Sequence, residues 1–411
     1  MDRPEDYSLL DPAVQECPYA AYAAMRRDAP VYRMPETGYY VITRYQDVRE
    51  ALRLTDVFSN DFDTRVLSPR GQPPEVVEIY SQHGWERKRV LQTDPPDHTR
   101  YRRLVDRAFT AGRVRAMEPY IDALVHELID EWIGDGEVEF ISRFANPLPM
   151  KVIADRLGVP REDAALFKRW SDASVDSIAI STPPERQVEC AWQLVEMQQY
   201  FVPLFEQRRR APQQDILSDI VTARLEDGRM LAVPELLDLV EQLLTGGNET
   251  TTHALGAGML LLIEHPHLVG RIRADIERLK IFVEEVLRLE SPTQGTFRQV
   301  RRDVELSGVT IPAGSMVNLR YGAANRDEQM FPEPATLDLD RPNAGAHLAF
   351  ISGIHHCLGA PLARQEMICA FRALLDRLEG LRLTEDRPPP HMPNFMMRGL
   401  TRLPIAFGTR K

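Results

Sequence analysis

Residues 350–361 read Phe-Ile-Ser-Gly-Ile-His-His-Cys-Leu-Gly-Ala-Pro, and this stretch carries the most chemical information in the chain. Gly353 and Gly359 bracket Cys357, and glycine is typical of places where the backbone comes close to another group. The pattern that follows predicts a helix from about 358 to 378. Because the N–H groups at the start of a helix stabilise a thiolate, Cys357 is a candidate for thiolate chemistry.

The loop alone supports three interpretations of Cys357. It is an axial ligand of heme iron, a nucleophile with His355 or His356 as its base, or an inert buried thiol. The iron-ligand and nucleophile interpretations carry similar weight. A zinc site is disfavoured, because the loop has neither a second sulfur nor a paired-histidine spacing. The other cysteines form no CxxC motif and no disulfide framework; they are Cys17, Cys190 and Cys369.

A long helix is predicted from Pro234 to His265, since proline suits a first helical turn and Pro266 blocks extension. About thirty residues give a rod of about 45 Å, and its apolar surface predicts a path through the core. Its centre, residues 244–252, reads Leu-Thr-Gly-Gly-Asn-Glu-Thr-Thr-Thr, which is poor in helix formers. The small residues fit either a tight helix crossing or a groove for a ligand, with Glu249 and Thr250 placed to handle protons.

The rest of the chain predicts a mainly α protein with small β-sheets. Two β-rich runs around Pro35–Gly38 predict a hairpin in a β-rich part over about 30–60. Residues 94–292 are mostly helical in pattern, 297–319 turn β-like, and 331–342 are rich in proline. We find no repeat and no long linker, so we expect a single domain over 1–411.

Composition and charge exclude several classes of protein. The 411 residues are 43% hydrophobic and 27% charged, which is typical of globular chains, and 50 basic against 61 acidic residues give a net charge of −11. This balance argues against a nucleic-acid-binding protein. The start of the chain is charged, and the longest apolar run, 254–263, is about half of the ~20 residues of a membrane span. We expect a soluble cytoplasmic protein without a membrane segment.

The spacing Phe350-x-x-Gly353-x-His355-x-Cys357-x-Gly359 resembles the heme-binding loop of the cytochromes P-450. Further motifs similar to those of bacterial members occur in the family's order over nearly the whole chain. They are Asp94–Arg102, Gly246–Thr251, the Glu285-x-x-Arg288 motif, and Arg298–Pro342 with Ala323–Asp327. The loop departs from the family at Ile351, where many members carry glycine, and at His356. Gly246 replaces a frequent alanine.

The resemblance implies a single-domain cytochrome P-450-like fold with the long central helix over heme b. It implies that Cys357, in the loop 350–359, is the axial thiolate ligand of the iron, and that Phe350 packs near it. The loop glycines Gly353 and Gly359 belong to the cofactor site. The groups expected to neutralise the heme propionates are His98, Arg102, Arg298 and His355.

The family pattern also implies roles for two acid-bearing motifs. Glu285 and Arg288 are expected to form a buried ion pair that shapes the scaffold of the heme loop. Glu249 and Thr250 are expected to deliver protons, with Glu249 linked to bulk water and the helix widened at its glycines to admit dioxygen. This pair favours a monooxygenase that uses dioxygen over a peroxide-only enzyme.

By family position, the substrate pocket has three walls and suits a largely apolar small molecule, with lids over 60–91 and 167–202. The reaction expected is hydroxylation or O-/N-demethylation. We found no flavin or iron–sulfur motif, so electrons are expected from NAD(P)H through a ferredoxin reductase and a ferredoxin that docks near the cysteine loop. We expect a monomer. The wall residues are Leu243, Gly246, Gln294, Thr296, Phe395 and Met396.

Two other classes of function compete with this one. A heme carrier or sensor has no need of the Glu249–Thr250 pair. A cysteine hydrolase would use His355 or His356, but it leaves the central helix and the His98 motif unexplained.

Overall fold

The computed structural model describes residues 3–67, 72–178 and 182–410. The chain divides into two compact units. Unit 1 comprises Met1–Ser59, Arg115–Leu148 and Thr250–Lys411, and unit 2 comprises Asn60–Val114 and Pro149–Glu249. A single domain therefore stays a prediction, and the two units are treated separately below.

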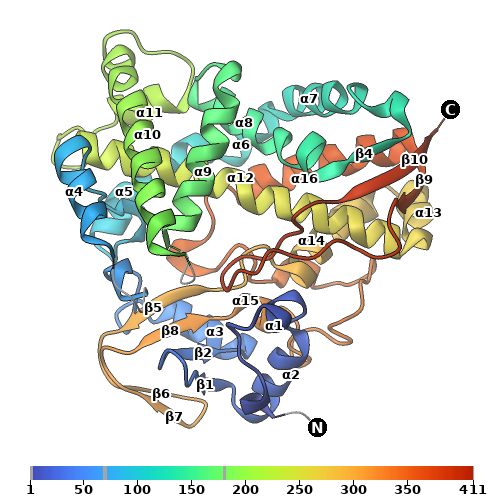
Figure 1. The fold of residues 1–411 in the computed structure, drawn as a ribbon, viewed down its shortest axis with the longest axis horizontal. Helices are drawn as coiled ribbons and strands as arrows, with labels where there is room; N and C mark the ends of the chain where they lie inside the picture. The colour runs from blue at the N-terminus through green and yellow to red at the C-terminus, as the bar shows by residue number, and fades with distance from the viewer. Residues whose placement is uncertain (1–2, 68–71, 179–181, 411) are drawn as a thin grey trace. The chain divides into compact units, whose positions relative to one another are not determined.

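Unit 1 contains a five-stranded sheet with strand order β1-β2-β8-β5-β3 (Figure 1). The predicted hairpin is its edge, with β1 antiparallel to β2. Strand β2 pairs with β8 in parallel, and β8 pairs with β5 antiparallel, so the sheet joins segments far apart in sequence. The strands are β1 (Val31–Arg33), β2 (Tyr40–Ile42), β3 (Phe58–Ser59), β5 (Thr296–Val300) and β8 (Met316–Leu319).

A separate hairpin joins β6 (Val304–Leu306) to β7 (Val309–Ile311). Its turn residues have positive φ, 48° at Ser307 and 75° at Gly308. Two central residues of positive φ match the right-handed twist of the strands, which is why glycine is favoured here. This is the turn that the Ser-Gly pair predicts.

One face of the five-stranded sheet packs against helix α3 (Tyr45–Arg53). The apolar spacing of this helix puts Tyr45, Val48 and Leu52 on one side, and all three are buried with Val317 of β8. Helices α1 (Pro12–Glu16), α2 (Tyr19–Asp28) and α15 (Tyr321–Ala324) belong to the same unit.

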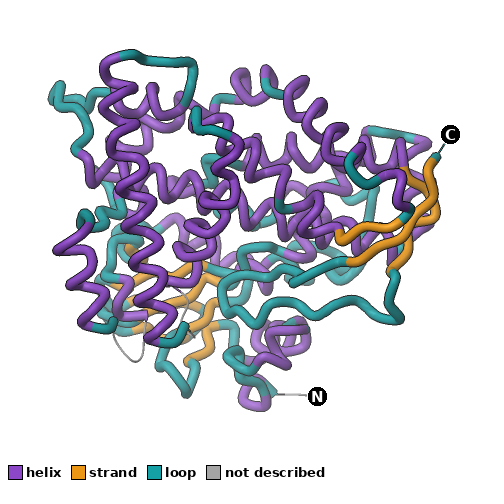
Figure 2. The backbone as a smooth tube through the Cα atoms, turned by 45° about the horizontal axis from the view of Figure 1, so that its top comes forward, coloured by secondary structure: helices purple, strands orange, loops and turns teal. Residues whose placement is uncertain are grey.

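The helical part of unit 1 is built on α16, which packs against α7 and α14. Figure 2 shows its three-stranded sheet, of order β4-β10-β9, as a group of orange strands apart from the five-stranded sheet. The elements are α7 (Glu118–Asp130), α13 (Pro266–Ala274), α14 (Glu277–Glu290), α16 (Ala360–Arg377), β4 (Glu137–Glu139), β9 (Leu378–Leu383) and β10 (Pro404–Thr409).

Unit 2 is helical in the residues that the structure describes. Helices α9 and α10 run side by side in Figure 1 and share an aromatic cluster in which the rings of Phe167 and Trp170 are 5.2 Å apart. Helix α4 packs on α10 through Val76, Ile79 and Val195. The helices are α4 (Pro74–His83), α5 (Asp97–Asp106), α6 (Ala111–Ala116), α8 (Pro147–Leu157), α9 (Ala164–Ile178), α10 (Pro184–Arg210) and α11 (Ile216–Thr222).

The central helix α12 runs unbroken from Val233 to Glu264, within one residue of its predicted ends. The boundary between the two units falls inside it, after Glu249. The helix assignment is continuous across Gly246 and Gly247, and the expected widening there stays a prediction. Tight packing occurs about three turns later, in unit 1: a side chain at Gly256 would come within 2.6 Å of Ile141, and Gly258 faces the ring of Phe371.

None of the helices within the described ranges has the length and apolar character needed to cross a membrane.

Candidate functional site

The cysteine loop of unit 1 is closed by its own backbone. The Cys357 N–H donates to the carbonyl oxygen of Phe350 at 2.9 Å, and the His356 N–H donates to that of Gly353 at 3.1 Å. Gly353 has φ +76°, and a Cβ there would lie 3.2 Å from the carbonyl oxygen of Leu52. The glycine is therefore required by both conformation and close approach.

Ile351 shows why its position favours glycine. Its φ is +59°, in the left-handed region that β-branched residues rarely adopt. Its N–H donates to the Leu348 carbonyl at 2.9 Å, and its side chain packs against the core of the five-stranded sheet. The departure noted in the sequence thus leaves the loop closed, with a locally strained residue.

Helix α16 begins at Ala360 with Gly359 as its N-cap, so Cys357 and Leu358 precede the helix that was predicted to start at about 358. Cys357 is partly exposed, and its carbonyl accepts from the Ala360 N–H at 3.4 Å. Burial raises the pKa of the Cys190 thiol to about 11 and raises the pKa of Cys369, so both of these stay protonated. Cys357 and the exposed Cys17 each precede a helix, and Cys357 is the one that lies in the glycine-bracketed loop.

Among the residues that the structure describes, no group of three or more His, Cys, Asp or Glu side chains could hold a metal ion. Within those residues, Cys357 belongs to no cluster of the kind that a structural zinc site requires. A heme supplies its own nitrogen ligands and needs only one side chain from the loop. The donor set fits that group.

An ion-pair cluster packs against Phe350, at the start of the cysteine loop. The Arg364 guanidinium lies 4.5 Å from the centroid of the Phe350 ring and makes two hydrogen bonds to Glu284, of 2.6 and 2.9 Å. His347 Nε2 is 3.0 Å from the same carboxylate. Burial alone would raise the pKa of Glu284, but the hydrogen bonds from Arg364 and His347 lower it to about 2.

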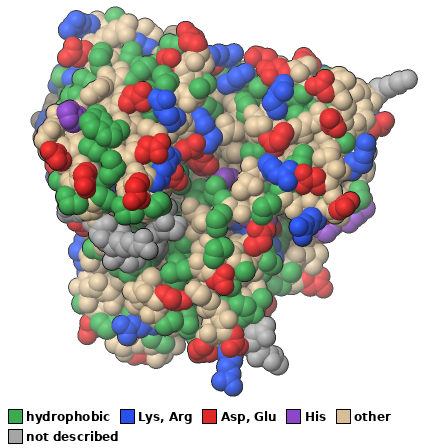
Figure 3. Space-filling model, viewed as in Figure 1, with side chains coloured by type: hydrophobic (Ala, Val, Ile, Leu, Met, Phe, Trp, Pro, Cys, Tyr) green, Lys and Arg blue, Asp and Glu red, His purple; other side chains and the backbone are tan. Residues whose placement is uncertain are grey.

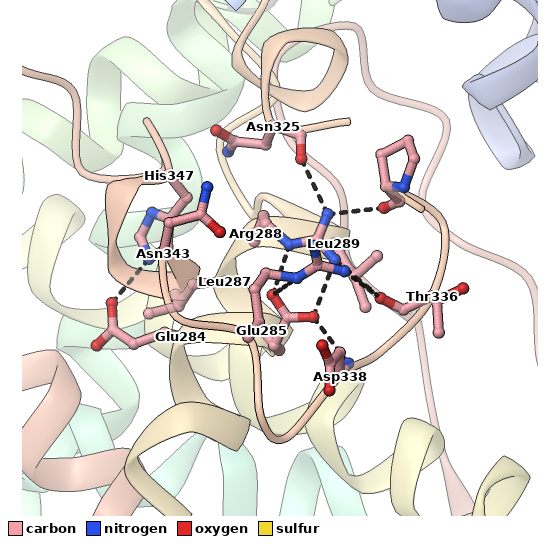
Figure 4. A network of polar contacts seen from close by, with 12 residues as sticks. Glu284, Glu285, Leu287, Arg288, Leu289, Asn325, Thr336, Asp338, Asn343 and His347 are labelled. Carbon is pink, nitrogen blue, oxygen red and sulfur yellow. Dashed lines mark hydrogen bonds and ion pairs between the residues drawn. The ribbon is translucent and has the colours of Figure 1, made fainter. Parts of the chain in front are cut away.

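Glu285 and Arg288 of α14 form a fully buried bidentate ion pair, with bonds of 2.6 and 2.9 Å (Figure 4). Arg288 also donates to the carbonyl oxygens of Asn325, Pro334 and Thr336. The second carboxylate oxygen of Glu285 accepts from the Asp338 N–H at 2.9 Å. We define the segment 325–341 as the meander. The ion pair holds the meander in place, and nearly all hydrogen-bond donors of Arg288 and acceptors of Glu285 are used.

Arg298 of β5 is 3% exposed, and its guanidinium donates to the carbonyl oxygen of Phe297 at 2.7 Å and to the Thr296 hydroxyl at 3.1 Å. The Thr296 hydroxyl is itself 2.5 Å from the Tyr321 hydroxyl. Thr296 therefore orients the arginine. His355, in the cysteine loop of the same unit, is partly buried.

Two of the predicted pocket walls meet in unit 1. The Gln294 N–H donates to the Met396 carbonyl at 2.7 Å, and the rings of Phe297 and Phe395 stack at 5.9 Å. The Gln294 side chain accepts from the Tyr22 hydroxyl at 2.8 Å and donates to two main-chain carbonyls of α14 and its C-terminus. Its amide thus holds the wall to the scaffold.

In unit 2, Glu249 is 8% exposed and lies 3.0 Å from the Lys168 ammonium of α9. Lys168 also pairs with Asp172, one helical turn further along α9. Burial, followed by the hydrogen bond to Glu249, raises the pKa of Asp172. Lys168, Asp172 and Glu249 form a charged triad, and the expected link from Glu249 to bulk water stays a prediction. Leu243 is buried on the same helix as Glu249, and Gly246 is exposed.

His98 and Arg102 share one face of α5 in unit 2, as their spacing predicts. His98 is 2% exposed, and burial, assisted by Arg102, lowers its pKa. Arg102 Nε donates to Asp106 at 2.6 Å. Their meeting with Arg298 and His355 at one cofactor stays a prediction.

Comparisons with known proteins identify the family to which the chain belongs. A family model described as Cytochrome P450 matches residues 166–406. The chain is 36% identical to "Cytochrome P450 107B1" of Saccharopolyspora erythraea over 98% of both chains, and 37% identical to "Cytochrome P450 monooxygenase PikC" of Streptomyces venezuelae over 95% of this chain and 91% of that one. It belongs to the cytochrome P450 family.

Solved cytochrome P450 structures share the fold. CYP109Q5 from Chondromyces apiculatus superposes with a TM-score of 0.86 at 36% identity, covering 98% of both chains. CREJ, solved with (4-ethylphenyl) dihydrogen phosphate, gives 0.90 at 29% identity, covering 98% of this chain and 100% of that one. The mainly α fold and the resemblance stated from the motifs are confirmed.

As a cytochrome P450, this chain is a heme-dependent monooxygenase that takes dioxygen, a substrate and electrons derived from NAD(P)H through partner proteins. The hydrolase and heme-carrier interpretations are therefore wrong.

Sequence reasoning missed Lys168, Asp172, Glu284 and Arg364. Lys168 and Asp172 are four apart with opposite charge, which by itself indicates only an ordinary helix-surface pair. Glu284 and Arg364 carry no local signal, because they are 80 residues apart. The predicted lids over 60–91 and 167–202 include 68–71 and 179–181, which lie outside the described residues.

Proposed function

We propose that this cytochrome P450 hydroxylates, or O- or N-demethylates, a largely apolar small molecule, with Cys357 as the heme ligand. The observation that carries the proposal is the closed loop that presents a partly exposed Cys357 just before α16. Relatives at 35% identity include a "Vitamin D(3) 25-hydroxylase" and a "6-deoxyerythronolide B hydroxylase", and both names describe hydroxylation.

The residues predicted from the sequence would hold the cofactor. Cys357 Sγ would bind the iron, and Phe350, Gly353 and Gly359 would shape the loop around it. When bound, heme supplies the site at which dioxygen is reduced. The propionates would be neutralised by the predicted set of His98, Arg102, Arg298 and His355, since a buried carboxylate requires charged or hydrogen-bonding partners.

Proton delivery is assigned to Thr250 and Glu249 of α12. Of the three consecutive threonines, Thr252 donates its hydroxyl to the Ala145 carbonyl at 3.2 Å and Thr251 is 3% exposed, whereas Thr250 is partly exposed. Thr250 would hold a proton-bearing hydroxyl towards the substrate side. Glu249 would return protons to it, and the contact with Lys168 would hold the Glu249 carboxylate in place.

The pocket is assigned to Leu243 and Gly246 of α12, Gln294 and Thr296 beside β5, and Phe395 and Met396 of the late turn. These side chains are mostly apolar, with a few polar groups to orient a ligand. The adaptable Met396 favours shape tolerance over strict selection.

We assign electron delivery to a ferredoxin that docks near α16. Arg364 and Arg372 of this helix keep 30% and 34% of their side-chain surface exposed, which suits an acidic partner. We place the reaction in the cytoplasm, where a reductase has access to NAD(P)H, and we propose that the enzyme acts as a monomer.

One experiment tests the reaction class. The holoenzyme is screened with apolar compounds for the spectral shift that accompanies displacement of the iron-bound water, and each hit is turned over with ferredoxin, reductase and isotope-labelled dioxygen. We expect products that carry one labelled oxygen atom, or have lost a methyl group. Products labelled from water, or hits that are never converted, would contradict the proposal.

The Cys357 ligand is tested separately. The reduced enzyme with carbon monoxide is expected to show the red-shifted Soret band of thiolate ligation, and Cys357→Ser to lose it. A histidine-type band in the unsubstituted enzyme would refute the assignment.

A further inference from the structure

A small cavity in unit 1 lies beside the turn at 394–398 and the N-terminal helix α1. It has room for about one water-sized particle, whose centre can occupy about 10 Å³, whereas sites for drug-sized ligands hold roughly 300–1,000 Å³. Its charged lining residues are Arg320 and Arg398, and no Asp or Glu occurs among the described residues that line it. The remaining polar lining residues are Gln15, Tyr22, Gln294 and Asn394.

Arg320 is a buried cation without a counter-ion among the described residues. It is 1% exposed, and its one hydrogen bond goes from Nη1 to the Phe395 carbonyl oxygen at 2.6 Å. Its guanidinium stacks 3.9 Å from the centroid of the Phe395 ring, and its Nε has no hydrogen-bond partner within the described parts of the chain. Arginine stays protonated in proteins, so this charge cannot be removed by losing a proton. An unpaired buried charge is costly.

The nearby carboxylates are already engaged. Glu290 is shared by Arg398, at 3.1 Å, and Arg326, at 3.5 Å. Glu16 accepts from the main chain and the ring of His391 at 2.9 and 2.8 Å. The cavity therefore keeps an excess of positive charge.

We propose that this cavity binds a small inorganic anion of halide size, with chloride as the natural ligand, against Arg320 Nε and with Arg398 as the second cation. The size of the cavity excludes larger organic anions, and its mixed polar and apolar walls suit a monatomic ion that needs few donors. The anion would also fix the turn that carries Phe395, because Arg320 holds the carbonyl of that residue. This inference does not depend on the proposed substrate.

Thermal unfolding of the full-length holoenzyme tests the site. Sodium chloride or bromide is titrated against sodium gluconate, whose anion is too large for the cavity, at constant ionic strength. Since a ligand that binds only the folded state stabilises it, we expect a saturable rise of a few degrees in Tm with either halide and none with gluconate. Equal Tm values in chloride and gluconate would overturn the proposal.

Two variants address the mechanism. Asn394 Oδ1 accepts from the N–H groups of Met396 and Met397 at 2.8 and 3.0 Å, so Asn394→Asp keeps both bonds while giving Arg320 a fixed counter-ion. We expect N394D to lose the halide effect and to be more stable than the parent in gluconate. Arg320→Met, which removes the cation, is expected to lose the halide effect as well. If R320M fails to fold, N394D alone decides the result.

The matched control is Arg302→Met, because Arg302 is 64% exposed on its side chain. R302M is expected to keep the full halide response of the parent. A halide response that survives in both N394D and R320M would overturn the proposal, and so would one that disappears in R302M.

Crystals grown in bromide give a direct readout. We expect an anomalous-scattering peak within hydrogen-bond distance of Arg320 Nε. A peak at that place without anomalous signal would identify a water molecule and would refute the anion site.

Discussion

At the scale of single residues, Ile351 of the cysteine loop has a backbone conformation that its β-branched side chain disfavours. Ile351 has φ +59°, and a left-handed conformation costs an L-residue about 1–2 kcal/mol. Two short-range hydrogen bonds hold it there: its N–H to Leu348, and its carbonyl 3.1 Å from His356 Nδ1. The loop therefore stores strain beside the proposed iron ligand.

A matched pair of substitutions measures that strain. Ile351→Ala keeps the Cβ and loses the packing, whereas Ile351→Gly loses both. We expect I351G to be more stable than I351A by about 1 kcal/mol, although glycine is normally the less stable of the two. Urea unfolding followed by circular dichroism gives the difference, and an I351A protein equal to or more stable than I351G would refute the account.

Thr250 and Thr252 offer a second matched pair. With Thr250→Ala, we expect NAD(P)H consumption to continue while product falls several-fold and hydrogen peroxide rises. With Thr252→Ala, the bond to the Ala145 carbonyl is lost, so we expect a fall of about 1 kcal/mol in unfolding free energy and unchanged coupling of NAD(P)H to product. The ratio of product to NAD(P)H is the measurement. Unchanged coupling in T250A would remove Thr250 from the proton path.

At the scale of elements, α14 and α16 are joined by Glu284 and Arg364 behind the cysteine loop. Because the pKa of Glu284 is lowered to about 2 from the 4.5 of an unperturbed glutamate, its contribution to stability is complete above pH 4.5 and is lost as the pH falls towards 2. We expect Glu284→Gln to lower the unfolding free energy at pH 7 by about 2–3 kcal/mol. The difference in unfolding free energy between E284Q and the parent should narrow below pH 4.5. A difference that stays constant with pH would show that the charge of Glu284 is not its cause.

Helices α9 and α12 are linked by the charged triad of Lys168, Asp172 and Glu249. Lys168→Met leaves two neighbouring carboxylates without their cation, so we expect a loss of about 1–2 kcal/mol, since Lys168 is about one-third exposed. The double variant K168M/D172N removes one of the two carboxylates and is expected to recover part of the loss. A double variant less stable than K168M would show that repulsion is not the cause.

Local patterns predicted the elements whose hydrogen bonds are local. The β1–β2 hairpin, the Ser307-Gly308 turn and the ends of α12 follow from turn chemistry and proline placement. The predicted start of α16, at about residue 358, was two residues too early, because Gly359 is the N-cap and the helix begins at Ala360. The parallel pairing of β2 with β8 and the Lys168–Glu249 contact join distant segments, and a single sequence carries no signal for them.

At the scale of the whole molecule, the net charge and the local arginines of α16 have opposite signs. The net charge is −11, and on the face seen in Figure 3 basic and acidic side chains are interspersed. Overall charge would repel an acidic ferredoxin, whereas local arginines of α16 would attract it. If repulsion by the net charge dominates, the rate of reduction by ferredoxin rises with salt; if attraction by the local arginines dominates, the rate falls.

We expect the rate of reduction by an acidic ferredoxin to fall as ionic strength rises, because screening weakens local attraction. Stopped-flow reduction over a series of salt concentrations measures it, with gluconate as the anion so that the cavity beside Arg320 is not involved. A rate that rises with salt would show that net charge dominates and that α16 is not the docking surface.

The ion pair of Glu285 and Arg288 bears on how the enzyme matures in the cell. Its bonds to Asn325, Pro334, Thr336 and Asp338 are all made by the polypeptide itself, so the meander needs nothing from outside to take its shape. We therefore expect the meander to form these hydrogen bonds while the chain folds, before the cofactor is inserted.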